Sequence, residues 1–331
     1  MSELALLRRF RAHAPSHPWL KLGPGHDCAL LDWPSGRALA FKIDQVVEGV
    51  HFVLSGPGAA DPRQVGWKAA AKACSDLAAA GCWPVAASAA LHLRRNLGDA
   101  WAWKLFQGLR DCGRRFSFAL AGGDFSSGPG PVSVAVSLLG EGPPILGKQG
   151  RRRAGEGGRE GPWRRSGARP GDCLLVTGDL GGSRARKHLS FLPRLEEARL
   201  LRELAAGAVH AAIDVSDGLS RDLNHLCNES RCGVELDARR IPLSRAARAS
   251  PHPLAAALGD GEDFELLLAL APEAADYVLR HWRHSTPLTR IGRFLSWTEG
   301  RWLRTSRGRR VQLPDLGYEH QTGRPKKRGH E

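Results

Sequence analysis

The chain has 331 residues, of which 42% are hydrophobic and 25% are charged, so it is long enough for two domains with separate cores. No apolar run approaches the roughly 18 residues of a membrane-spanning helix, and the N-terminus lacks a signal-peptide pattern, so we expect a cytoplasmic protein without a membrane partner. The net charge of +14 is concentrated in residues 148–165 (net +5) and 321–331 (net +3), and we therefore do not expect a nucleic-acid partner.

The first half of the chain alternates strand and helix patterns. Strands are predicted at residues 38–44, 85–93, 117–121 and 132–139. Amphipathic helices are predicted at residues 64–80 and 99–116. Trp101 and Trp103 of the second helix are expected in the core. The alternation indicates an α/β domain.

The second half repeats this alternation after a segment that lacks periodicity. Strands are predicted at residues 173–177, 211–215, 234–237 and 264–270, with helices starting near Asp217 and after Pro272. The segment between the halves is rich in Gly, Arg and Pro and is predicted to be a linker loop. We therefore divide the chain into an N-terminal domain (1–142), a basic linker (143–165), a C-terminal domain (166–320) and a basic tail (321–331).

The seven cysteines are odd in number and widely spaced, and none forms a Cys-x-x-Cys pair. Cys227 and Cys232 are too isolated from other ligand residues to bind zinc alone. We therefore predict reduced core cysteines, as in a cytoplasmic protein.

Six aspartates lie in short glycine-marked or polar motifs, several of them at the end of an apolar strand-like run. They are Asp27, Asp44, Asp76, Asp124, Asp214 and Asp217. One such aspartate alone would be an ordinary turn or cap residue. Six can converge only if cations such as Mg²⁺ offset their repulsion, and Mg²⁺ held by carboxylates normally also holds substrate phosphates. The pattern therefore indicates phosphoryl transfer, although P-loop and protein-kinase signatures are missing.

Eight motifs, in family order, resemble those of thiamine-monophosphate kinases, which belong to the superfamily of aminoimidazole ribonucleotide synthetase and selenophosphate synthetase. They are Gly25–Ala29, Asp44–Phe52, Ser75–Gly81, Gly122–Asp124, Arg165–Asp172, Ile213–Leu219, Gly261–Leu266 and Gly317–His320. The resemblance implies a two-domain α/β (α+β) fold like that of aminoimidazole ribonucleotide synthetase, with an N-terminal domain that forms a homodimer. It also implies ATP-dependent, Mg²⁺-assisted phosphorylation of thiamine monophosphate to thiamine diphosphate.

The same resemblance implies roles for particular residues. The six aspartates match the family's Mg²⁺ ligands. The ATP contacts match Gly123, Asp124, Arg165 and Ser216, and the contacts to thiamine monophosphate match His51, Glu262 and Tyr318. No further catalytic residue is assigned, because direct transfer to a phosphate oxygen depends mainly on positioning and charge neutralisation. Two alternatives stay open: an enzyme of this superfamily with another phosphate or amide acceptor, and a degenerate nucleotide-binding protein.

Two positions depart from the family pattern. His26 replaces an acidic residue beside Asp27, and Lys42-Ile43-Asp44 replaces a Ser-Thr-Asp step. Strand alternation places Lys42 and Asp44 on one face of a strand. We therefore expect the Lys42 ammonium to point into the site and to offset the carboxylate charge in place of a metal cation, without the coordination bonds that a metal would form.

Overall fold

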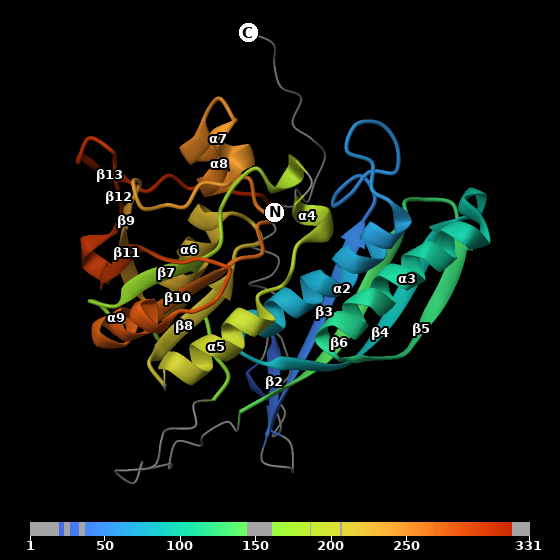
Figure 1. Cartoon of the computed structure of the whole chain (residues 1–331), viewed down its shortest axis with the longest axis horizontal. Helices are drawn as coiled ribbons and strands as arrows, with labels where there is room; N and C mark the ends of the chain where they lie inside the picture. The colour runs from blue at the N-terminus through green and yellow to red at the C-terminus, as the bar shows by residue number, and fades with distance from the viewer. Residues whose placement is uncertain are drawn as a thin grey trace.

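The computed structural model describes residues 20–22, 27–32, 37–143, 161–185, 187–205 and 207–319, which form two α/β domains side by side (Figure 1). His26, His320, most of the predicted linker (144–160) and the predicted tail (321–331) lie outside the described residues. The expected two-domain α/β (α+β) fold is confirmed.

The N-terminal domain is a six-stranded sheet with two long helices on one face (Figure 1). The strands, in sheet order, are β1 (Leu20–Leu22), β2 (Ala29–Asp32), β3 (Ala38–Val47), β6 (Ser133–Gly142), β4 (Trp83–Arg94) and β5 (Ala119–Gly128). Only the β4–β5 pair is parallel among these strands. The helices are α2 (Pro62–Ala79) and α3 (Gly98–Phe116). A long loop, residues 48–61, joins β3 to α2, and the 3-10 turn η1 (Arg95–Leu97) joins β4 to α3.

The C-terminal domain is a seven-stranded sheet with helices on both faces. Its strands, in sheet order, are β13 (Arg310–Gln312), β12 (Arg301–Arg304), β9 (Cys232–Asp237), β11 (Leu288–Ser296), β7 (Cys173–Thr177), β10 (Leu266–Leu270) and β8 (Val209–Asp214). Helices α5 (Leu195–Ala205) and α9 (Pro272–His281) cover one face, and α6 (Leu219–Ser230) and α8 (Pro253–Gly259) cover the other. Short segments complete the domain: α4 (Lys187–Ser190), α7 (Arg245–Arg248), η2 (Ser183–Ala185) and η3 (Trp297–Glu299).

Most predicted elements are confirmed within a few residues, but three expectations are wrong or incomplete. The strand predicted at 117–121 runs on through Gly122, Gly123 and Asp124 to the end of β5, because its backbone pairs with β4 along that length. Helix α5, the shorter helices α4, α7 and α8, and strands β1, β2, β11, β12 and β13 were not predicted. Trp103 is 56% exposed and stacks on Phe106, whereas the core had been expected.

The predicted burial of the cysteines is confirmed. All seven cysteines are free and buried. No helix in the described parts of the chain is long and apolar enough to cross a membrane.

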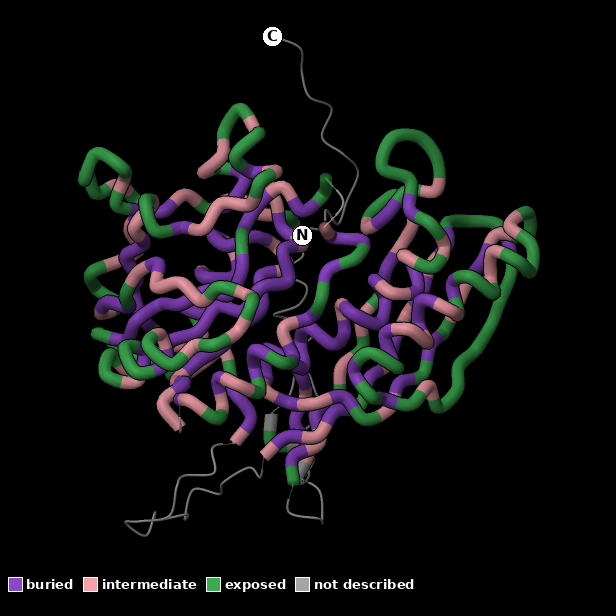
Figure 2. The backbone as a smooth tube through the Cα atoms, viewed as in Figure 1, coloured by how far each residue is buried: buried purple, intermediate pink, exposed green. Residues whose placement is uncertain are grey.

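The described end of the predicted linker is packed: Trp163 is buried, its backbone N–H donates to the Ala80 carbonyl, and Arg202 lies over its ring. Figure 2 shows that β5, at the outer edge of its sheet, is exposed along most of its length.

Helix α2 lies between the two domains and packs closely on α3. An N-cap at Asp61, with Pro62 in the first turn, starts the helix, and a left-handed Gly81 follows its end. Its run of alanines lets the sheet and α3 approach closely. On its other side, α2 contacts α5 and β8 of the C-terminal domain. One continuous apolar cluster therefore includes residues of both domains.

Two glycines permit the close crossing of α2 and α3. A Cβ atom at Gly66 would lie 2.0 Å from the Leu105 carbonyl oxygen, and one at Gly108 would lie 1.9 Å from the Arg63 carbonyl oxygen. Because both contacts are to backbone, Gly66→Ala should force the helices apart and lower the free energy of unfolding by about 1–3 kcal/mol, despite the better helix propensity of Ala. Urea denaturation measures this, with Lys104→Ala, exposed on α3, as the control. An unchanged midpoint for Gly66→Ala would contradict the tight crossing.

Candidate active site

Three buried carboxylates meet where the domains adjoin. Asp27 lies just before β2, Asp76 lies in the last turn of α2, and Asp214 ends β8. One oxygen from each lies within 4.8 Å of the others, and Ser75 Oγ donates to Asp214 Oδ2 at 2.6 Å. Two strand ends and a helix end thus place three acidic side chains in one small volume.

The three carboxylates are difficult to ionise together. Burial raises the pKa of Asp76 well above its usual range, and the neighbouring Asp214 adds to this effect. Burial, together with the charge of Asp27, raises the pKa of Asp214 to about 6. A buried group of oxygen ligands that resists simultaneous ionisation fits a hard divalent cation, which would favour the ionised forms.

Two lysines lie beside the cluster. Lys42 Nζ lies 3.0 Å from Asp76 Oδ2 and 3.8 Å from Asp44 Oδ2, and Lys72 Nζ lies 2.9 Å from Asp44 Oδ1. Lys42 and Asp44 therefore share a face of β3, as predicted. Although burial opposes its charge, Asp76 and Asp44 raise the pKa of Lys42 above its usual range. The site thus carries permanent positive charge as well as carboxylates.

Arg165 is held by the cluster itself. Its Nε and Nη2 atoms donate to the two oxygens of Asp27, each at 2.9 Å, in a bidentate pair. The sequence assigned Arg165 to nucleotide phosphates, and the structure places its guanidinium beside the carboxylates that would hold the metal. Arg165, Lys42 and Lys72 therefore all place positive charge beside these carboxylates.

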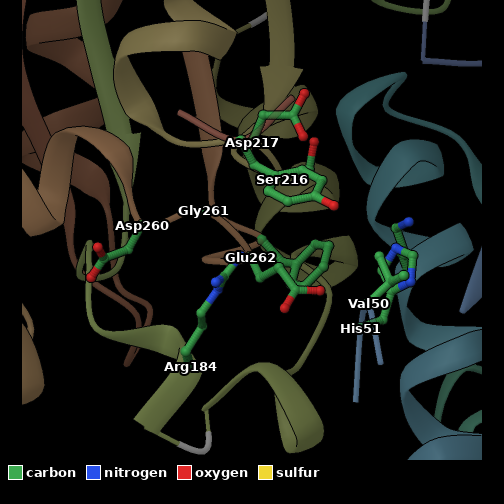
Figure 3. A pocket seen from close by; sticks show the side chains of 11 residues that line it. Val50, His51, Arg184, Ser216, Asp217, Asp260, Gly261 and Glu262 are labelled. Carbon is green, nitrogen blue, oxygen red and sulfur yellow. The ribbon is translucent and has the colours of Figure 1, made fainter. Parts of the chain in front are cut away.

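A pocket next to this cluster lies between the domains (Figure 3). One wall comes from the loop after β3, with Val50 and His51, and from Lys72 of α2. The opposite wall comes from the C-terminal domain. Its lining residues are Arg184, Ser216, Asp217, Asp260, Gly261, Glu262, Phe264 and Tyr318. The structure therefore brings Ser216 together with all three residues predicted to contact the acceptor.

Glu262 is fixed by buried partners. Its backbone is left-handed (φ 56°), and its carboxylate lies 2.7 Å from Lys68 Nζ and 3.2 Å from His188 Nδ1. Lys68 is fully buried and also donates to the His51 carbonyl at 2.6 Å. Although burial opposes ionisation, the hydrogen bond from His188 and the charge of Lys68 lower the pKa of Glu262 to about 2. Glu262 therefore presents a fixed negative charge at the pocket.

His51 and the loop after β8 are also held in place. Burial, with the charge of Lys72, lowers the pKa of His51 to about 4, so its imidazole is neutral near pH 7. The Val47 backbone N–H donates to His51 Nδ1 at 3.1 Å. The Asp222 carboxylate accepts from three successive backbone N–H groups, those of residues 216–218, at 2.9–3.0 Å. These amides fix the loop and are not available to a phosphate.

Comparison with known proteins identifies the family to which the chain belongs. Residues 25–141 match the family described as AIR synthase related protein, N-terminal domain, and residues 169–296 match its C-terminal domain. The chain is 34% identical to a thiamine-monophosphate kinase of Rhodopirellula baltica, over 96% of this chain and 97% of that protein. The chain belongs to the thiamine-monophosphate kinase family.

Other members support the same assignment. The thiamine-monophosphate kinase of Escherichia coli is 34% identical over 91% of this chain and 92% of its own length. A solved structure described as AaThiL complexed with AMPPCP and TMP superposes with a TM-score of 0.78 at 25% identity, covering 96% of this chain and 97% of that one. The similarity therefore extends over both domains.

In this member of the thiamine-monophosphate kinase family, not all six predicted aspartates converge. Asp44 adjoins the cluster through Lys42, and Asp217 lines the pocket. Asp124 does neither. The sheet register aligns Asp44 with Gly123 across three strand spacings, roughly 14 Å, and Asp124, the next residue, faces the opposite side of the sheet. Within one chain, Gly123 and Asp124 are therefore separate from the cluster.

Several residues of the site were not identified from the sequence of this family member. They are Lys68, Lys72, Arg184, His188, Asp222 and Asp260. Lys68 and Lys72 carried a usable signal: they interrupt the apolar run of α2 four residues apart, and so lie on one face of the helix. Arg184, His188 and Asp260 have partners far away in the sequence, whereas Asp222 accepts from backbone N–H groups only four to six residues away.

Proposed function

We propose that this chain transfers the γ-phosphoryl group of ATP to the phosphate of thiamine monophosphate, giving ADP and thiamine diphosphate. The observation that carries the proposal is the group of three buried carboxylates beside a pocket whose wall presents ionised Glu262. Relatives of the same family, similar over both domains, carry the name of this activity. The solved AaThiL complex contains AMPPCP and TMP.

The chain would hold Mg²⁺ through Asp27, Asp76 and Asp214, with Asp44 and Asp217 nearby. When bound, the ion would neutralise phosphate charge and hold the phosphates in position. The surrounding side chains add charge of their own: Lys72 and Lys42 balance Asp44 and Asp76, and Arg165 presents a guanidinium fork next to Asp27. Phosphate groups entering this region would meet a nearly neutral, largely dehydrated environment, in which electrostatic interactions are strong.

The acceptor would bind in the pocket by its cationic ring system. The Glu262 carboxylate can pair with the thiazolium charge or accept from the aminopyrimidine, because Lys68 and His188 keep it ionised and oriented. Tyr318, whose ring lies 5.8 Å from the Arg184 guanidinium carbon, offers an aromatic face. The acceptor phosphate is already anionic, so a new O–P bond forms as the bond to ADP breaks, with little need for a protein base.

The test is a product assay with the full chain, ATP, Mg²⁺ and thiamine monophosphate. The expected result is ADP and thiamine diphosphate in equal amounts. ADP formed only with another phosphate or amide acceptor would favour a different enzyme of the superfamily. No turnover with any acceptor would favour a degenerate nucleotide-binding protein. The proposal includes a cytoplasmic location, which the free, buried cysteines support.

The proposal also includes a homodimer formed through the N-terminal sheet. The sheet face away from α2 and α3 carries the neighbouring apolar side chains Phe41, Ile43 and Leu139, which are 42%, 62% and 38% exposed. We expect light scattering to give the mass of a dimer at micromolar concentration, and Ile43→Lys to shift it towards the monomer because it places charge in an apolar contact. Trp103→Lys, an exposed aromatic on the helical side, is the control. A monomeric wild-type chain would contradict the proposal.

A further inference from the structure

Lys42 bridges two acidic side chains at the edge of the carboxylate group. Its ammonium lies between Asp76 Oδ2 at 3.0 Å and Asp44 Oδ2 at 3.8 Å, on the side of β3 that faces α2. Among the ion pairs of the described residues around this cluster, Lys42 is the cation that contacts two of the carboxylates. A bridging position between two carboxylates is where a divalent ion would otherwise lie.

The position of Lys42 is set by the sheet. Its residue pairs with Leu138 in the ten-residue ladder between β3 and β6, which fixes where the side chain starts. The side chain is mostly buried, so its ammonium can move only a short way without breaking both ion pairs. A second cation placed about 4 Å from it would repel it by several kcal/mol at a protein-like dielectric constant. Lys42 and a divalent ion therefore compete for the space between Asp44 and Asp76.

The charges of the region agree with this competition. Four carboxylates, those of Asp27, Asp44, Asp76 and Asp214, lie in or beside the cluster, and three have an ion-pair partner. The partners are Lys42, Lys72 and Arg165. Little uncompensated negative charge is left for divalent ions, compared with the same carboxylates without their side-chain cations.

We propose that the Lys42 ammonium occupies the place of one divalent cation between Asp44 and Asp76, so that the chain binds one divalent ion fewer than it would with a small neutral residue at this position. The inference rests on the proposed ATP-dependent function and concerns the number of metal ions at that same site. An ammonium donates hydrogen bonds and cannot coordinate phosphate oxygens as Mg²⁺ does, so Lys42 supplies charge but no ligand-exchange site.

The test counts Mn²⁺ bound per chain by equilibrium dialysis, with and without a non-hydrolysable ATP analogue. Lys42→Ser should bind one more Mn²⁺ per chain than the wild type, because serine frees Asp76, leaves Asp44 with Lys72 as its only cation, and adds an oxygen ligand. Lys104→Ser, which removes an exposed lysine from α3, should match the wild type. Equal Mn²⁺ counts for Lys42→Ser and the wild type would overturn the proposal.

Thermal unfolding gives a second readout. In EDTA, Lys42→Ser should melt at a lower temperature than the wild type, since the buried Asp76 carboxylate loses its cation and Asp44 keeps only Lys72. Added Mn²⁺ should raise the Tm of the variant more than that of the wild type. Lys42→Gln, which keeps most of the length of the side chain without its charge, should show the same trend. If either variant is unfolded in EDTA, refolding on addition of Mn²⁺ supports the proposal, and failure to refold overturns it.

This outcome can be separated from that of the proposed function. If the wild-type chain does not phosphorylate thiamine monophosphate but Lys42→Ser still binds the extra Mn²⁺, the assigned acceptor is wrong and the proposed role of Lys42 stands. If the wild-type chain phosphorylates thiamine monophosphate and the two Mn²⁺ counts are equal, the proposed function stands and the role of Lys42 is wrong.

Discussion

Asp214→Asn should lower kcat by about 100-fold or more while leaving the fold intact. Asp214 is one of the three convergent carboxylates, and a divalent ion at such a site contributes several kcal/mol to the transition state, where 1.36 kcal/mol corresponds to a tenfold change in rate. The amide keeps the size of the side chain and can still accept the hydrogen bond from Ser75. Steady-state kinetics with ATP and thiamine monophosphate measure the loss.

The same variant should be more stable than the wild type when metal is removed. The native pKa of Asp214, about 6, lies above the value of about 3.9 in an unfolded chain. The native state therefore binds more protons between these values, and wild-type stability falls as the pH rises through that window. In EDTA above pH 7, Asp214→Asn should gain on the order of 3 kcal/mol, and below pH 4 the difference should vanish.

Asp179→Asn, at an exposed loop position, is the matched control and should change neither activity nor stability. If Asp214→Asn retained near-normal kcat, the carboxylate group would not be the metal site. If it were destabilised in EDTA at pH 7 and above, the repulsion that we attribute to the three carboxylates would not exist.

Glu265→Ala should have the largest effect on stability in the C-terminal domain. The Glu265 carboxylate is fully buried and accepts from Arg194 Nε and Nη2, each at 2.6 Å, from Lys187 Nζ at 2.8 Å and from Thr177 Oγ1 at 2.8 Å. Removing it leaves a mostly buried guanidinium without its main counter-charge. Breaking a buried pair in this way costs about 3–5 kcal/mol, which urea denaturation at pH 7 would show as a large fall in the midpoint.

The pH dependence of this loss has a definite sign. Although burial opposes ionisation, Lys187 and Arg194 hold the pKa of Glu265 below its usual range, so its stabilisation is present above the unfolded value and is lost as the pH falls through the native one. The gap between wild type and Glu265→Ala should narrow in acid. Glu203→Ala, which removes a largely exposed i,i+4 partner of Arg199, should cost less than about 0.5 kcal/mol. If Glu265→Ala and Glu203→Ala lowered the free energy of unfolding by similar amounts, the burial of Glu265 would not contribute to stability.

The elements of the fold could be predicted from the sequence where local periodicity decides structure. Strand β7 was predicted at its observed bounds, and the helix predicted to start near Asp217 is α6, whose buried face carries Leu219, Leu223 and Leu226. Strand β11 was missed because Arg290 and Arg293 interrupt its apolar pattern. Both side chains reach carboxylates on neighbouring elements, a contact that no local pattern encodes.

The site was predictable in its residue types but not in its grouping. The motifs identified Asp27, Asp76 and Asp214, whose convergence depends on how two domains pack. Lys68 could not be interpreted alone: its partners Glu262 and His188 lie far along the chain, and a lysine within an apolar run is otherwise a surface residue. Strand alternation correctly placed Lys42 beside Asp44. The same alternation places Asp124 on the opposite side of the sheet, but this follows only once the register between the strands is observed.

Helix α2 has a consequence for how the enzyme can move. One of its faces completes the core of the N-terminal domain, and the same continuous apolar cluster reaches α5, α9 and β10. Independent domains joined by a linker can melt separately and hinge apart, whereas domains that share a core do not open without exposing it to water. The chain should therefore unfold as one cooperative unit. Turnover would then be gated by the loops that rim the pocket, such as the one carrying Val50 and His51, rather than by a hinge between the two halves.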